Sequence, residues 1–433
     1  MTTKQHKAAW ALGTVIIAGI AAAAGYAWQP AIDPLPQAPA ADTNQTLITQ
    51  GARVAELGDC MQCHTTQNGK PYAGGLPLAT PFGTIYSTNI TPDVETGIGS
   101  WTQEAFARAL RKGVSRDGHL LYPAFPYPHF THMTDDDVAA LYAYLMARTP
   151  VHAPAKTNEL TFPLSFRPLV AGWNFLFLDE GPLPPATPPQ SAQPQSDAWL
   201  RGRYLVEGAG HCASCHSPMN ALGAEKSGQA FAGGLIDGWD VPPLNTLAHA
   251  RKPWTEAQLA DYLRTGIASE HSAAAGPMQP VTHHLARAPE SDIQAIATYL
   301  MSLQTPAPAQ PVAEAAPSTA DTQVLTAGAA IFNASCAGCH SAAAPMRTLG
   351  NRPALELGST LNADSSRNAI QMVLNGNPWN GSSTAHYMPP FAGVLNDQQI
   401  ADVLAYARAT YAQRPAWSDL PARVAAIRKE NSQ

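Results

Sequence analysis

The sequence is poor in charge and in the motifs of enzymes that carry their own cofactor. Only 13% of the 433 residues are charged, and the formal net charge is −6 at pH 7. Nucleic-acid binding usually requires clustered basic residues, so this composition predicts no nucleic-acid partner. The sequence has no phosphate-binding loop, no G-x-G-x-x-G after a predicted strand and no H-E-x-x-H. It therefore offers none of these cofactor sites for substrate oxidation.

Long hydrophobic runs are also scarce. Only the run from Ala8 to Trp28 is long enough to cross a bilayer, at about 31 Å as a helix. Lys4 and Lys7 precede it and predict a cytoplasmic N-terminus. We therefore predict a single-pass anchor in the cytoplasmic membrane within residues 1–30, with the rest of the chain periplasmic. The alternative is a cleaved signal peptide, because Gly-Tyr-Ala before Trp28 resembles a cleavage site.

One short pattern occurs three times. The sequence has six cysteines, and all of them lie in C-x-x-C-H motifs, which are CMQCH, CASCH and CAGCH. C-x-x-C-H is the attachment signature of c-type haem, and its histidine becomes the proximal iron ligand. We therefore predict three covalently bound haem c groups. The predicted attachment residues are Cys60, Cys63, Cys212, Cys215, Cys336 and Cys339, and the predicted proximal ligands are His64, His216 and His340.

Two stretches rich in proline and alanine, 182–196 and 305–322, read as linkers and leave one motif in each of three segments. In every segment a short helical pattern precedes the motif, and an amphipathic helix closes the segment. This order resembles the small class I cytochrome c fold, in which the first and last helices cross. The fold class expected is all-α, with three tandem cytochrome c domains behind a transmembrane helix. The predicted domains are residues 44–181, 197–304 and 323–415, followed by a C-terminal tail at 416–433.

Electron-transfer haems usually have a second axial ligand, and methionine in that place raises the reduction potential. In the cytochrome c fold this ligand lies shortly before the last helix. Met388, in YMPPFAGVLNDQQI, is the predicted sixth ligand of the third segment. Met278, in AAAGPMQPVTHHL, is predicted for the second, with His283 and His284 as alternatives.

The first segment leaves its sixth ligand open. By analogy with the other two loops the ligand should fall near Phe125, which cannot bind iron. Met133 is the favoured candidate and His129 is the main alternative, with His132 also in reach. A five-coordinate haem is a further alternative, and it would make a peroxidase-like catalytic function conceivable.

Particular stretches of the chain resemble one family. These are AGGLPLATPFGTIYSTNITPD, RDGHLLYPAFPYPHFTHMTDDDVAALYAYL and FRPLVAGWNFLFL. They are similar to the membrane-bound cytochrome c subunits of alcohol and aldehyde dehydrogenases from acetic acid bacteria and related proteobacteria. The resemblance implies an electron-transfer subunit, not an enzyme, that passes electrons from a periplasmic dehydrogenase through the haems to membrane ubiquinone.

Two branches of that family differ in their catalytic partner. The branch serving alcohol dehydrogenases with pyrroloquinoline quinone usually reads Y-P-A-M-P-Y, whereas this sequence reads YPAFPY. The difference favours a molybdenum-type aldehyde dehydrogenase as partner, with a small iron-sulfur accessory subunit. The pyrroloquinoline quinone branch is the alternative. A free electron shuttle is disfavoured by the apolar stretch 162–178, which is typical of a partner or membrane surface or of a wrap over the domain core.

Overall fold

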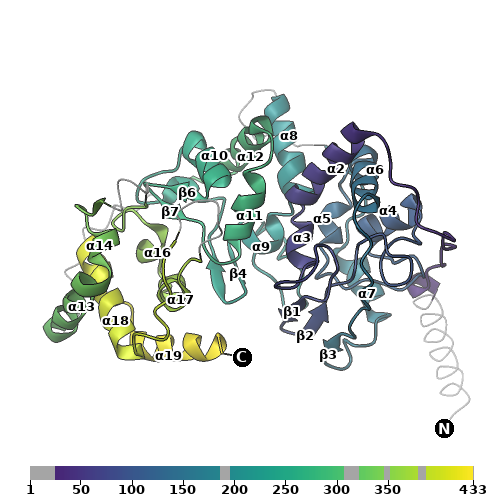
Figure 1. Ribbon diagram of the computed structural model, residues 1–433. Helices are drawn as coiled ribbons and strands as arrows, with labels where there is room; N and C mark the ends of the chain where they lie inside the picture. The colour runs from purple at the N-terminus through teal and green to yellow at the C-terminus, as the bar shows by residue number, and fades with distance from the viewer. Residues whose placement is uncertain (1–24, 186–195, 307–320, 346–351, 379–386, 433) are drawn as a thin grey trace, which may run out of the picture. The chain divides into compact units, whose positions relative to one another are not determined.

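Helices dominate the computed structural model, and the strands are few and short (Figure 1). The chain forms two compact units. The first comprises Met1–Ala192 with Glu207–His211, and the second comprises Gln193–Val206 with Cys212–Gln433. The structure describes residues 25–185, 196–306, 321–345, 352–378 and 387–432.

The first unit holds the first haem segment. Its helices are α2 (Gln45–Leu57), α3 (Cys60–Cys63), α4 (Gln103–Lys112), α5 (Tyr127–Phe130), α6 (Asp135–Met146) and α7 (Leu169–Phe177). A small antiparallel sheet has the order β1-β2-β3, formed by β1 (Pro77–Thr80), β2 (Gly83–Tyr86) and β3 (Glu159–Leu160). Thr134 caps α6, because its hydroxyl accepts a hydrogen bond from the Asp137 amide at the start of this helix.

The second unit holds the second and third haem segments. The second segment contains α8 (Asp197–Glu207), α9 (Ala213–His216), β4 (Gly234–Ile236), β5 (Trp239–Val241), η1 (Leu247–His249), α10 (Glu256–Thr265), β6 (Ile267–Ala268), β7 (Ser272–Ala273), α11 (Met278–Leu285) and α12 (Glu290–Ser302). The third contains α13 (Thr322–Ser335), α14 (Ala337–His340), α16 (Ser359–Asn362), α17 (Arg367–Asn375), α18 (Asp397–Ala407), η2 (Arg408–Ala412) and α19 (Leu420–Glu430).

In each segment the first helix crosses the amphipathic closing helix, which is α6, α12 or α18, at a glycine. A Cβ added to Gly51 on α2 would lie 1.9 Å from the Ala140 carbonyl oxygen on α6. The equivalent Cβ at Gly202 would lie 1.9 Å from the Ala295 carbonyl oxygen. At Gly328 the distance to the carbonyl oxygen of the facing helix is 2.1 Å. Only glycine permits such an approach of two helix backbones. The glycines therefore allow the first helix of each segment to pack directly on the closing helix.

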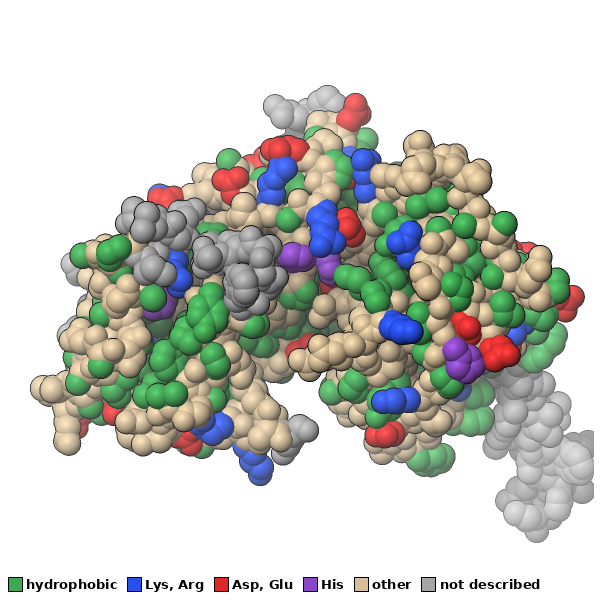
Figure 2. All heavy atoms as spheres, viewed as in Figure 1, with side chains coloured by type: hydrophobic (Ala, Val, Ile, Leu, Met, Phe, Trp, Pro, Cys, Tyr) green, Lys and Arg blue, Asp and Glu red, His purple; other side chains and the backbone are tan. Residues whose placement is uncertain are grey.

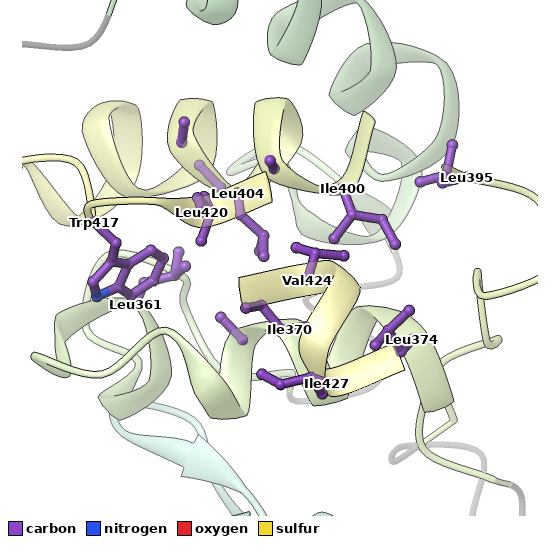
Figure 3. Close-up of a cluster of buried hydrophobic side chains, with 14 of the residues drawn as sticks. Leu361, Ile370, Leu374, Leu395, Ile400, Leu404, Trp417, Leu420, Val424 and Ile427 are labelled. Atoms are coloured by element: carbon purple, nitrogen blue, oxygen red, sulfur yellow. The ribbon is translucent and has the colours of Figure 1, made fainter. Parts of the chain in front are cut away.

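The core of the third segment extends beyond the predicted domain (Figure 3). Residues 416–433, which we expected to form a tail, contain α19. Its Leu420, Val424 and Ile427 pack with Ile370 and Ile400 of α17 and α18 in one hydrophobic cluster. The prediction of a tail followed from the many charged residues of this stretch, whose apolar residues lie on one face of the helix.

Charged side chains are scattered among hydrophobic and uncharged ones on the face shown in Figure 2, in keeping with the low charge of the sequence. Within the described ranges, no helix has both the length and the apolar character needed to cross a membrane. The predicted anchor within residues 1–30 lies almost entirely outside those ranges, which begin at Gly25.

Candidate haem sites

The three C-x-x-C-H motifs each form a short helical turn directly after the first helix of a segment. These turns are α3, α9 and α14. Helical geometry places residues three apart on one side of the backbone, so both cysteines of a motif face the same way. The histidine follows at the end of the turn. This arrangement suits two thioether bonds to one haem and a ligand to its iron.

The predicted proximal histidines of the first two segments are oriented by backbone carbonyls. The His64 Nδ1–H donates to the Thr88 carbonyl oxygen at 2.6 Å, and the His216 Nδ1–H donates to the Pro242 carbonyl oxygen at 2.8 Å. Both acceptors follow the second strand of a hairpin. With Nδ1 protonated, Nε2 carries the lone pair that iron requires.

A glycine fixes the chain around each of these histidines. The Gly74 amide donates to the His64 carbonyl oxygen at 2.8 Å, and the Gly233 amide donates to the His216 carbonyl oxygen at 2.7 Å. Both glycines have positive φ, +71° and +88°. A Cβ at Gly74 would lie 2.3 Å from the Thr88 backbone. The glycine therefore lets residues 73–75 pass between His64 and its acceptor segment, so that the histidine and the Thr88 carbonyl meet.

Burial sets the protonation of the sites. Burial lowers the pKa of His64 and of His216, which favours the neutral imidazole that binds iron. Burial also lowers the pKa of His340, and nearby Arg352 adds to the shift. The thiol pKa values of Cys60 and Cys212 are raised to about 12 by burial.

The residues present fit haem c. Each motif supplies two thiols and one imidazole, and in two segments the imidazole tautomer is the one that iron needs. In the third, the His340 Nδ1 is buried without a hydrogen-bond partner among the described residues. Haem c would be held by the three cysteine pairs and by the three histidines.

Met133 lies inside the core of the first segment. Its side chain is 4% exposed and belongs to the hydrophobic cluster against which Cys60 packs. The His129 Nδ1–H donates to the Glu207 carbonyl oxygen at 3.0 Å, and the His132 Nδ1–H donates to the Gly181 carbonyl oxygen at 2.6 Å. The shared cluster supports Met133 as the sixth ligand, which stays a prediction.

Met278 is the first residue of α11 and follows a tight turn. Gly276 has φ +53°, and a Cβ there would lie 2.5 Å from the Trp239 ring. The alternatives His283 and His284 lie in the last turn of the same helix, and the His284 side chain is buried. The structure therefore places Met278 at the N-terminus of α11 and both histidines more than one helical turn beyond it.

Met388 lies on an extended loop before α18. Its amide donates to the Asn377 carbonyl oxygen at 3.0 Å, and the Asn377 amide donates to the Met388 carbonyl oxygen at 2.8 Å. Asn396 caps α18 and forms a capping box with Gln399. Met388 thus forms a β-bridge with Asn377 and lies on the loop that leads to a capped helix.

Some residues that shape the sites were not found from the sequence. The acceptors at Thr88 and Pro242 are backbone carbonyls, which have no sequence signature. Asn377 lies in the polar stretch NGNPWNG, where nothing in the sequence singles it out. The partner of its side chain, Ala274, lies 103 residues away in the chain.

Family profiles match each haem segment. The profile of the family described as cytochrome c matches residues 48–149 and 200–304. The profile described as cytochrome C oxidase, cbb3-type, subunit III matches residues 323–406. Cytochrome c domains of this kind hold covalently bound haem c, as the cysteine motifs predict.

Several characterised proteins are similar to the chain along most of its length. One of the subunits of the nicotinate dehydrogenase of Pseudomonas putida is 45% identical over 99% of this chain, which spans only 36% of that protein. The gluconate 2-dehydrogenase cytochrome c subunit of Pantoea cypripedii is 38% identical over 90% of this chain and 91% of its own length. The cytochrome c subunit of the quinone-dependent alcohol dehydrogenase of Gluconobacter oxydans is 37% identical, over 85% and 79% respectively. The resemblance read from the sequence is confirmed.

Proposed function

Because the chain belongs to the family of cytochrome c subunits of dehydrogenase complexes, we propose that it conducts electrons through three haems to membrane ubiquinone. Members of this family are electron-transfer subunits and not the catalytic ones. The electrons come from a catalytic dehydrogenase subunit that oxidises the substrate. The observation that carries the proposal is the attachment turn, which occurs three times and each time follows a helix that crosses a later helix at a glycine.

The residues of the chain act by holding and tuning each haem. Bound haem supplies the one-electron couple of its iron. The carbonyls of Thr88 and Pro242 hold two proximal imidazoles in the ligating tautomer. The apolar cluster around Met133 keeps water away from that face of the first site. Met278 and Met388 raise the potentials of the second and third haems as thioether ligands.

The partner is a molybdenum-type dehydrogenase, which oxidises an aldehyde or an N-heterocycle and has a small iron-sulfur subunit. Phe125 in YPAFPY supports this branch. The similarity to one of the subunits of nicotinate dehydrogenase supports it too, since nicotinate is an N-heterocycle. The similarity to subunits of quinone-dependent alcohol dehydrogenases keeps a pyrroloquinoline quinone partner as the second candidate.

The proposed location is the periplasmic face of the cytoplasmic membrane, with an anchor within residues 1–30. An apolar surface near the end of that anchor supports the location. Phe162, Phe166 and Phe175 are 82%, 58% and 74% exposed. The Phe175 ring contacts the Tyr26 ring edge-on, with centroids 6.0 Å apart. Exposed aromatic side chains beside a membrane span are typical of the bilayer interface.

Purification of the native complex tests the proposal. The chain, tagged at its C-terminus, should be extracted by detergent together with a larger subunit that contains molybdenum. Added substrate of that subunit should reduce the haems, and a ubiquinone analogue should reoxidise them. Co-purification of pyrroloquinoline quinone would select the second candidate, whereas isolation without any dehydrogenase would contradict the proposal.

A peroxidase-like function makes a different spectroscopic prediction. It requires an open iron in the first segment, so carbon monoxide should bind one reduced haem in three without any displacement of a ligand. Electron transfer with Met133 as sixth ligand predicts negligible carbon monoxide binding at that haem.

A further inference from the structure

The loops that carry Met278 and Met388 are joined by one buried asparagine. The Asn377 side chain is 1% exposed, and its Nδ2 donates to the Ala274 carbonyl oxygen at 3.1 Å. Ala274 is itself 1% exposed and lies four residues before Met278, in the stretch that leads from β7 into α11. The backbone of Asn377 pairs in both directions with that of Met388. A single residue therefore contacts the ligand loops of two different haem segments.

The geometry around Asn377 leaves little freedom. Gly376 has φ +66°, and a Cβ on it would lie 2.3 Å from the Met388 carbonyl oxygen. On the other side, the Ala274 amide donates to the Gly266 carbonyl oxygen at 2.7 Å at the end of α10. A second link runs in parallel, because the Gln279 Nε2 donates to the Pro378 carbonyl oxygen at 3.1 Å. A shift of either loop must therefore be transmitted to the other.

We propose that Asn377 is a positioning residue that sets the methionine ligation of the second and third haems together. It binds no haem itself and acts through Ala274 on the Met278 loop and through its backbone on Met388. Loss of the amide weakens both methionine–iron bonds, so external ligands compete better at both haems and both potentials fall. The inference rests on Met278 and Met388 as sixth ligands, which belongs to the proposed function.

The contact between the second and third segments provides a matched control. The Asn368 Nδ2 donates to the Asp240 carbonyl oxygen at 2.7 Å, and the Asp240 amide donates back to Asn368 Oδ1 at 2.9 Å. Asn368 on α17 thus bridges the same two segments with the same side chain. It contacts β5 instead of a ligand loop. If a loosened contact between the segments changes the haems, substitution of either asparagine should change them. If Asn377 acts on methionine ligation, only substitution of Asn377 should do so.

The test compares Asn377→Leu with Asn368→Leu in the full-length haem-loaded protein. Imidazole binding to the oxidised haems and a spectroelectrochemical titration are measured for each. In Asn377→Leu, imidazole affinity should rise about fivefold at two haems, as expected for one lost hydrogen bond. Two of the three potentials should shift downward. In Asn368→Leu all three haems should match the unaltered protein. A shift at one haem only, or equal shifts in both variants, would overturn the proposal.

Two further sets of variants keep the outcome decisive. If Asn377→Leu fails to retain three haems, Asn377→Ser should show the same paired shift, because its hydroxyl is too short to reach Ala274. Met278→Ala and Met388→Ala should each remove the methionine-to-iron absorption of one haem. If neither does, the ligand assignment of the proposed function has failed. If both do and the Asn377 variants leave both haems unchanged, only the role of Asn377 is refuted.

Discussion

The first and third haem segments share a pair of crossing helices and differ in where they place the predicted sixth ligand. In both, a glycine brings the first and last helices together, Gly51 in one and Gly328 in the other. Met133 then lies in the core directly before the cap of α6, whereas Met388 lies on a bridged loop eight residues before Asn396. The helix crossing and the attachment turn are therefore the constant part of the repeat. The part that varies is the stretch with the predicted sixth ligand.

The largest effect is expected from the shared helix crossing. In Gly51→Val or Gly328→Val the new side chain would overlap a carbonyl of the facing helix, at Cβ distances of 1.9 and 2.1 Å. Each variant should lose at least about 3 kcal/mol of stability, as an extreme case of overpacking. One haem per chain should be lost, measured by the pyridine haemochrome spectrum. Gly172→Val in α7, where a Cβ meets nothing within 4 Å, should keep all haems. Equal haem content in all three variants would mean that the crossings do not matter.

The next largest effect is expected from removal of the predicted methionine ligand in either segment. Met388→Leu and Met133→Leu keep the bulk of the side chain but cannot bind iron, so each should convert one haem to the high-spin state. Electron paramagnetic resonance of the oxidised protein measures this conversion. An unchanged spectrum in Met133→Leu would exclude Met133. The variant His129→Ala would then be expected to give the high-spin signal.

A smaller effect should be confined to the third segment. Arg428 on α19 pairs with Asp397 at 2.7 Å, and it also donates to the Ala392 and Leu395 carbonyl oxygens of the Met388 loop. Arg428→Leu should lower the stability of this segment by about 2 kcal/mol, as hydrogen bonds from a charged group imply. Urea unfolding followed by the absorbance of the third haem measures it. The exposed Arg423 on the same helix is the control, and an equal loss in Arg423→Leu would refute the role of Arg428.

The smallest effect is a pH dependence at the same helix. The hydrogen bond from Arg367 holds the pKa of Glu430 below its usual value. The stabilisation is therefore present above the ordinary glutamate pKa and is lost as the pH falls through the lowered value in the folded protein. Because this pair lies at the surface, it is expected to contribute only a few tenths of a kcal/mol. Glu430→Gln should remove this part of the acid sensitivity in urea unfolding between pH 7 and pH 3. An unchanged acid profile would argue against it.

The comparison also shows what the sequence could and could not reveal. The attachment turns, the amphipathic helices and the caps at Thr134 and Asn396 were predictable, because each depends on residues close together in the chain. Helix α19 was missed, because its apolar face is recognised only against α17 and α18. The roles of Thr88 and Asn377 depend on contacts between distant parts of the chain, which local patterns do not encode.

The central claim is that each of the three C-x-x-C-H motifs carries one covalent haem. Intact-mass spectrometry of the denatured protein, produced in cells that attach c-type haem, tests it most directly. We expect a mass equal to the polypeptide plus three haem groups. We also expect one group fewer in each of Cys60→Ser, Cys212→Ser and Cys336→Ser when the second cysteine of that motif is replaced as well. A denatured protein with the mass of the bare polypeptide, or with haem that acid–acetone extracts, would contradict the account.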